Sequence, residues 1–155
     1  MSKPVFIYVT YIASTPEKVF EALTSHEATA RFWFGNAATS DWKVGSPIEF
    51  HRQGKLIIRG KILENDSPHR LSYSFQAMHE PHNGQEPASR VLFELEPQKD
   101  QVKLTVTHDD FPPDSKVFPS ISNGWPLVLS SMKSYIETNR VLRAPWYEKE
   151  EAVAS

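Results

Sequence analysis

Hydrophobic and polar residues alternate along much of the chain with a period of two, which is typical of strands with one buried face. The alternation is clearest in Leu71, Tyr73 and Phe75, which are separated by Ser72 and Ser74. The pattern predicts strands over residues 4–12, 48–50, 56–62, 71–75, 91–95 and 102–108, with a brief pairing at 41–44. Short turns between consecutive strands favour an antiparallel meander.

Two short helices are predicted between the first strand and the rest of the sheet. Ser14 and Thr15 are alternative N-caps, since Pro16 suits the first helical position and Glu17 has capping-box spacing from Ser14. A second short helix is expected over residues 26–33, which precede a turn.

The period changes to that of a helix near the C-terminal end of the chain. Residues 122–139 predict one long helix, and Asn139 is expected to end it because asparagine tolerates the left-handed conformation. Prolines in residues 111–119 predict an irregular crossover before this helix, and residues 78–87 predict a polar, mobile loop.

An amphipathic helix and a set of one-sided strands must cover each other to bury their apolar faces. The order of elements therefore predicts an α+β fold, with a curved antiparallel sheet of about six or seven strands around the long C-terminal helix. A length of 155 residues fits one domain, expected over residues 4–142. Residues 143–155 are expected to form an extended tail, on which exposure of Trp146 and Tyr147 would favour a protein-interaction role.

Several segments resemble the bacterial branch of the activator-of-heat-shock-protein-90-ATPase family (Aha1-like C-terminal domain), within the START-like SRPBCC superfamily. The resemblance is carried by residues 15–24, 32–35, 41–46, 68–73, 104–108 and 124–133, and it spans nearly the whole chain. It implies the helix-grip fold, a small apolar ligand such as a lipid, hormone or polyketide, or a chaperone as partner. The eukaryotic activators carry a further chaperone-binding domain for which 155 residues leave no room, so we expect the small ligand ahead of the chaperone.

Composition and charge narrow the classes of partner. The net charge of −2 and the scattered basic residues give no attraction to nucleic acid. The chain has no cysteine, which excludes disulfides and thiolate metal sites. We expect no membrane span, because no apolar run approaches about 20 residues. The N-terminus lacks the pattern of a signal peptide, so we expect a cytoplasmic location.

Large apolar residues at inward positions are the candidate ligand-binding residues. Either they line a pocket between the helix and the sheet, or they simply fill the core. The candidates are Phe32, Trp33, Trp42, Phe50, Tyr73, Phe75, Phe93, His108, Phe111, Trp125, Leu129 and Met132. A pocket for such a ligand should exceed about 300 Å³.

His108 lies at an inward position at the end of the last predicted strand, next to two aspartates. It is a candidate polar anchor or general base, because the pKa of imidazole is easily moved near neutrality. The alternative is a strand-end histidine that is hydrogen-bonded to a turn carbonyl. Tyr73 and Tyr135 are candidate hydroxyl donors at inward positions.

Metal and catalytic motifs are weak in this sequence. His79, Glu80, His82 and Glu86 have metal-binding side chains, but they lie on the predicted polar loop without fixed spacing, so a solvated loop and no metal site are expected. Serine-nucleophile elbows and nucleotide-binding glycine motifs do not occur, and no cofactor is expected. The sequence favours a non-enzymatic binding domain, then a protein-interaction or chaperone-accessory domain, then an enzyme that uses the same pocket.

Overall fold

The computed structural model describes residues 3–145. In chain order the elements are β1 (Phe6–Ile12), α1 (Pro16–Thr24), α2 (His26–Phe32), β2 (Ala37–Thr39), β3 (Pro47–Arg52), β4 (Lys55–Asp66), β5 (Arg70–Ala77), β6 (Ser89–Gln98), β7 (Gln101–Asp109) and α3 (Val117–Thr138). The expected tail, including Trp146 and Tyr147, lies outside the described residues from position 146 onward.

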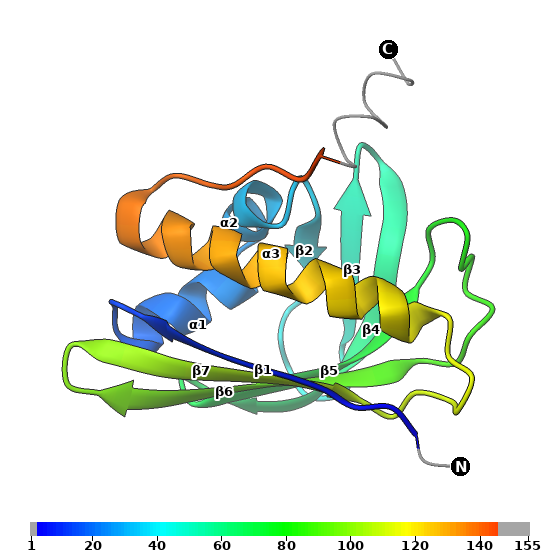
Figure 1. Ribbon diagram of the computed structural model, residues 1–155, viewed down its shortest axis with the longest axis horizontal. Coiled ribbons are helices and arrows are strands. Elements are labelled where there is room, and N and C mark those ends of the chain that lie inside the picture. Colours follow the sequence, from blue (N-terminus) through cyan, green and yellow to red (C-terminus); the bar gives the residue numbers. More distant parts are fainter. Residues whose placement is uncertain (1–2, 146–155) are drawn as a thin grey trace.

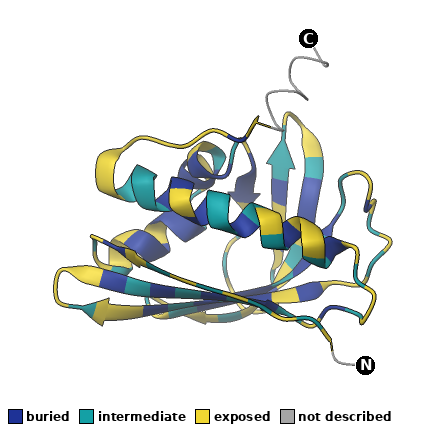
Figure 2. Cartoon of the chain, in the orientation of Figure 1, coloured by how far each residue is buried: buried dark blue, intermediate teal, exposed yellow. Residues whose placement is uncertain are grey.

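The strands form one seven-stranded sheet in the order β1-β7-β6-β5-β4-β3-β2, and every neighbouring pair is antiparallel. The sheet curves, α3 lies across its inner face, and α1 and α2 close one end (Figure 1). Buried residues follow the side of α3 that faces the sheet (Figure 2). The predicted α+β helix-grip fold, with a curved antiparallel sheet around the long helix, is confirmed.

The strands β5 and β6 show the predicted alternation directly. Leu71 and Tyr73 are buried on β5, and they pair with Phe93 and Val91 of β6. These side chains form the floor of the core, since aromatic and branched residues opposite one another stabilise antiparallel pairs.

Strand β4 departs from simple alternation because Ile57 and Ile58 are both buried. In the pairing with β3, Phe50 lies opposite Ile58 and His51 lies opposite Leu56, which leaves Ile57 as the extra residue of a β-bulge. A bulge turns two consecutive side chains toward the same side. The irregularity adds a second isoleucine to the inner face of the sheet.

The brief strand expected at residues 41–44 is wrong. The pairing segment is β2, and residues 40–46 form a loop in which the Asp41 carboxylate accepts a hydrogen bond from the Lys43 backbone N–H at 2.9 Å. Trp42 has φ of 66°, a left-handed conformation that a strand does not permit. The side chain of Trp42 is half-buried and packs at the margin of the core.

The long helix begins at Val117, five positions before the predicted start near residue 122, so the predicted crossover over residues 111–119 is too long. Pro119 is tolerated because backbone N–H groups in the first helical turn have no partner within the helix. The predicted end is confirmed: Asn139 has φ of 61° and donates its backbone N–H to the Tyr135 carbonyl at 2.8 Å. The chain then turns back along α3, where the backbone N–H of Leu142 donates to the Ser131 hydroxyl at 3.2 Å (Figure 1).

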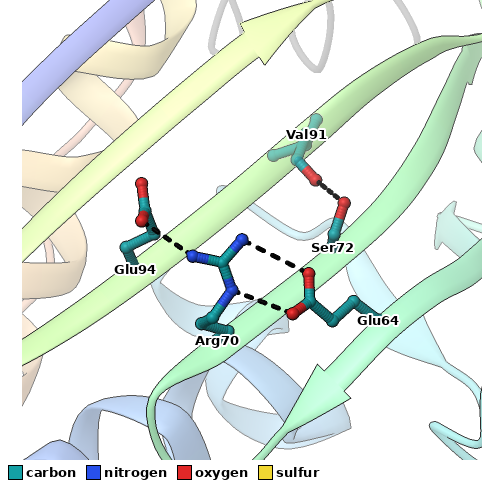
Figure 3. A network of polar contacts seen from close by, with 5 residues as sticks. All are labelled: Glu64, Arg70, Ser72, Val91 and Glu94. Carbon is teal, nitrogen blue, oxygen red and sulfur yellow. Dashed lines mark hydrogen bonds and ion pairs between the residues drawn. The ribbon is translucent and has the colours of Figure 1, made fainter.

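The outer face of the sheet carries a charged network that spans three strands. Arg70 of β5 contacts Glu64 of β4 and Glu94 of β6, with nitrogen–oxygen distances of 2.9 Å to each carboxylate (Figure 3). Beside it, the Ser72 hydroxyl donates to the Val91 carbonyl at 2.7 Å. The neighbouring carboxylates raise the pKa of Arg70. The network is partly exposed and ties strands together, and it is remote from the inner face.

Candidate functional site

A cavity of about 180 Å³ lies between the first half of α3 and the β3–β4 hairpin. Its apolar wall comes from the end of α2, from β4 and β5, and from one face of α3. The apolar lining residues are Trp33, Phe34, Ile57, Ile58, Phe75, Ile121, Trp125 and Val128. The bulge in β4 therefore contributes to the wall, since it brings both isoleucines inward.

Aromatic rings form the deep side of the cavity. The ring centroid of Trp33 lies 5.1 Å from that of Trp125 on α3 and 4.8 Å from that of Phe50 on β3. Ring pairs at these separations and tilts are favourable beyond their buried area. The two indoles are thus held by packing, and they present a rigid apolar surface.

The volume of this cavity can be compared with those of known ligand pockets. It falls short of the roughly 300 Å³ at which pockets for drug-sized ligands begin. It is close to the cavity of about 150 Å³ in another protein that binds benzene. The space between helix and sheet has room for about one aromatic ring or a short alkyl chain, and it is open to the surface on one side.

Gly124 lies in the middle of α3 and opens onto the cavity. In the described part of the chain, no heavy atom outside its own helix backbone and chain neighbours lies within 4 Å of a Cβ built on this glycine. Gly124 shares the lining face of α3 with Ile121, Trp125 and Val128. The cavity extends to the helix backbone at this point because the position carries no side chain.

Polar side chains also line the cavity. Asn36, Arg52, His79 and Ser120 come from four separate segments, and Arg52 is the only charged residue among the described lining residues. His79 is fixed by the contact of its Nδ1 with the Ile57 carbonyl at 3.3 Å. The site thus combines an apolar wall with a few polar groups, as ligand pockets commonly do.

His108 is completely buried at the centre of a hydrogen-bonded chain rather than bonded to a turn carbonyl. Its Nδ1 accepts from the indole N–H of Trp125 at 2.9 Å, and its Nε2 lies 2.7 Å from the Ser89 hydroxyl. That hydroxyl donates to the Phe75 carbonyl at 3.1 Å. Burial lowers the pKa of His108 to about 3. Both ring nitrogens are engaged, so the residue has no lone pair left with which to act as a base on a ligand.

The loop between β5 and β6 is exposed along much of its length, as its sequence suggests, but two of its side chains contact the start of α3. His82 is buried, and its Nε2 lies 3.3 Å from the Ser120 hydroxyl on α3. Burial, with His79 nearby, lowers the pKa of His82. The Glu86 carboxylate accepts from the backbone N–H groups of Lys116 and Val117 at 3.0 and 3.3 Å, and from the Ser115 hydroxyl. Glu86 thus caps α3, and the described residues hold no cluster suited to a metal ion.

Three of the candidate binding residues line the cavity: Trp33, Phe75 and Trp125. The others lie elsewhere in the core or at its margin: Phe32, Trp42, Phe50, Tyr73, Phe93, His108, Phe111, Leu129 and Met132. Tyr73 is buried among rings, which raises its pKa. Tyr135 packs on Phe32 and beneath the Arg31 guanidinium, away from the cavity.

Sequence reasoning missed several lining residues, namely Asn36, Arg52, Ile57, Ser120, Ile121 and Gly124. One signal was available: a glycine inside a helical pattern costs stability and usually has a packing or functional reason.

Comparison with known proteins identifies the family. The family model described as activator of Hsp90 ATPase homolog 1-like protein matches residues 13–137, well over half of the chain. The chain belongs to the Aha1-like family. A search of curated proteins found no match.

Several solved structures share the fold. The Aha1 dimer of Colwellia psychrerythraea is 22% identical, with a TM-score of 0.71, over 87% of this chain and 97% of its own. A Cytophaga hutchinsonii protein is 26% identical, with a TM-score of 0.69, over 90% and 98%. An Hsp90 activator from Plasmodium falciparum is 25% identical, with a TM-score of 0.65, over 78% and 86%. In the described part of this Aha1-like chain, no helix is long and apolar enough to cross a membrane.

Proposed function

We propose that this Aha1-like domain binds a small, largely apolar molecule, about the size of one aromatic ring, in the cavity between α3 and the β3–β4 hairpin. The observation that carries the proposal is the position of Gly124. Its backbone opens onto the cavity, and a side chain there would enter empty space.

A glycine in the interior of a helix destabilises the protein by roughly 0.5–1 kcal/mol relative to alanine. Close packing against another element would explain such a residue, yet a Cβ at Gly124 meets no neighbour within 4 Å in the described chain. A second explanation is relief of strain near Pro126, which also lies inside α3. Space for a ligand is the explanation that accounts for the cavity as well.

Titration with toluene, followed by backbone amide NMR, tests the proposal. We expect shifts at the lining residues Ile57, Ile58 and Ile121, and saturation at one site. The Gly124→Leu variant places a side chain in the cavity and should weaken toluene binding at least tenfold. Ser130→Leu is the matched control, because Ser130 is an exposed residue of the same helix and does not line the cavity.

Two results would count against ligand binding. One is the absence of saturable shifts in the wild-type protein; the other is equal binding by the Gly124→Leu and Ser130→Leu variants. A reduced unfolding free energy in Gly124→Ala would instead favour the strain explanation, since the methyl group itself meets no neighbour.

A protein-interaction role is the second candidate, and the outer side of β1 favours it. Ile7, Val9 and Tyr11 of this edge strand are 62%, 44% and 45% exposed, and Val5, directly before the strand, is 52% exposed. Residues 4–13 contain no charged side chain, although edge strands are commonly protected by charges. The relatives described as an Aha1 dimer and as an Hsp90 activator support protein contact as a role for the family. Pairing of β1 with β1 of a second copy is the simplest such contact.

A further inference from the structure

We propose that the ligand of this cavity is a small phenol, whose hydroxyl group donates a hydrogen bond to Nε2 of His79. The inference rests on the proposed function and adds the chemistry of the polar end of the ligand. It is carried by the contacts that hold the His79 ring, which leave one acceptor unused on the wall of the cavity.

One contact determines which nitrogen of the His79 ring carries the proton. Nδ1 of His79 lies 3.3 Å from the Ile57 carbonyl oxygen. A carbonyl oxygen can only accept, so Nδ1 must be the donor. In the neutral ring Nε2 therefore has no proton and is an acceptor. The same carbonyl also accepts the Met78 backbone N–H at 2.8 Å, as its two lone pairs allow.

The His79 ring is held in place from two sides. The backbone carbonyl of His79 accepts the N–H groups of His82 and Asn83 at 2.9 and 3.0 Å, which fixes the turn that carries the ring. The ring of His82 packs edge-on against it, with the centroids 5.4 Å apart. Within residues 3–145, Nε2 of His79 makes no hydrogen bond. Because His79 lines the cavity, this lone pair is available to a molecule bound there.

The other polar side chains of the lining have partners within the protein. Asn36 and Arg52 already interact with other groups of the chain. The Ser120 hydroxyl lies 3.3 Å from Nε2 of the buried His82. The acceptor of His79 is therefore the clearest unused polar group of the lining, and an acceptor on the wall favours a donor on the ligand.

The size of the cavity limits what can carry this donor. Its volume of about 180 Å³ exceeds that of the benzene-binding cavity of about 150 Å³ by little more than one small substituent. Trp33, Trp125 and Ile121 supply apolar surface for a ring. A hydroxyl adds a single heavy atom, and a phenolic O–H is a good donor because it is weakly acidic, with a pKa of about 10. A ring with one hydroxyl group matches both the volume and the acceptor.

Phenol and fluorobenzene form the test pair, because fluorine replaces the hydroxyl at nearly the same size and cannot donate. In an apolar pocket without an acceptor, phenol would bind more weakly than fluorobenzene, since its hydroxyl would lose its hydrogen bonds to water. We expect the wild-type protein to bind phenol at least as tightly as fluorobenzene, measured by amide NMR at pH 8, where free phenol and free imidazole are both neutral. His79→Phe should shift the ratio of the two dissociation constants at least about tenfold toward fluorobenzene.

A control variant and a direct measurement isolate the role of the His79 ring. The matched control is His69→Phe, because His69 is exposed and does not line the cavity. In the wild-type protein, the nitrogen NMR signal of His79 Nε2 should move when phenol binds and much less when fluorobenzene binds. This measurement needs no variant, so it decides the question even if His79→Phe fails to fold.

The outcomes separate the two proposals. If toluene and fluorobenzene bind while phenol binds more weakly, if His79→Phe and His69→Phe behave alike, or if the Nε2 signal does not respond to bound phenol, the phenol inference is overturned and the cavity proposal stands. If toluene, fluorobenzene and phenol all fail to bind, both are overturned. Urea unfolding of each variant shows whether a loss of binding reflects a loss of folded protein.

Discussion

The indole N–H of Trp125 donates to Nδ1 of His108 over 2.9 Å, and this hydrogen bond determines which nitrogen of the histidine carries the proton. Indole nitrogen can only donate, so Nδ1 must be the acceptor. The proton of the neutral ring then lies on Nε2 and is donated to the Ser89 hydroxyl, which donates in turn to the Phe75 carbonyl. A fully satisfied polar chain of this kind rigidifies the core that it crosses.

The pKa of His108 predicts a dependence of stability on pH. The folded-state pKa of about 3 lies below the ordinary value of 6.5, so the unfolded chain binds the extra proton between these values. The contribution of His108 to the unfolding free energy is therefore fully present above pH 6.5. It decreases as the pH drops toward 3, with a slope of up to about 1.4 kcal/mol per pH unit. Urea unfolding at pH 7.5 and 5.5 measures the effect.

Direct NMR detection of the His108 ring nitrogens provides the control for this prediction, because carboxylates also contribute to acid sensitivity. We expect a neutral ring protonated at Nε2 at pH 5. A charged His108 ring at that pH would contradict both the tautomer and the stability argument.

Trp125→Phe should lower the unfolding free energy by about 2–3 kcal/mol, because it leaves Nδ1 of His108 buried without its donor and removes packed volume. Chemical denaturation measures the change. Trp42→Phe is the comparison variant, since Trp42 is half-buried at the core margin and should be affected less. Equal losses of unfolding free energy in the two variants would show that the hydrogen bond between Trp125 and His108 contributes little to stability.

Glu86→Gln should destabilise the protein by about 1 kcal/mol, because a carboxylate at the first turn of α3 caps its N–H groups and interacts favourably with the helix dipole. Hydrogen exchange at Lys116 and Val117 should accelerate in the variant. Glu80→Gln, an exposed change in the same loop, should alter neither quantity. An equal loss of stability in Glu80→Gln would show that the change in net charge, rather than the loss of the helix cap, destabilises the protein.

Gly124→Ala should raise the unfolding free energy by about 0.5–1 kcal/mol, since the added methyl group enters open space and alanine favours the helix. Gly60→Ala should do the opposite and cost at least about 2 kcal/mol, because its Cβ would lie 1.8 Å from the Ser74 carbonyl oxygen. Thermal unfolding of both variants ranks them against the wild type. A loss of stability in both variants would favour relief of strain near Pro126 as the reason for Gly124.

Ile7→Lys should change the unfolding free energy by less than about 0.5 kcal/mol, since Ile7 is 62% exposed. It should nevertheless abolish any self-association through β1, measured by light scattering across a range of protein concentrations. Leu63→Lys, which alters another exposed apolar residue on β4, is the matched control. If the wild-type protein stays monomeric throughout, pairing of β1 with a second copy is excluded.

The parts of the fold that were predictable from sequence depend on local periodicity. Tyr73 and Phe93 lie in strands whose alternation fixes the buried face, and Asn139 carries its own conformational preference. The start of α3 is marked in part by a local signal that the prediction missed, since the Ser115 hydroxyl accepts from the Phe118 backbone N–H at 3.0 Å. Its capping carboxylate, Glu86, precedes Lys116 by 30 residues and becomes a neighbour only in the folded chain.

The site was predictable only in part, for a related reason. Trp33 and Trp125 are large and apolar, so they stand out at inward positions. Arg52, on β3, belongs to the lining because of where the hairpin lies relative to α3. Ile57 lines it through a bulge whose existence depends on how β3 and β4 pair. Neither of these two positions carries a local sign of its role.

The capping of α3 by Glu86 has a consequence for divergence within the family. Two side chains accept backbone N–H groups at the start of α3, Ser115 next to the helix and Glu86 from the β5–β6 loop. The number of residues in that loop therefore bears on where the helix begins above the cavity. An insertion or deletion there would displace the helix start without altering any residue on the helix. A change in loop length would therefore alter the volume of the cavity while the residues of the helix stay the same.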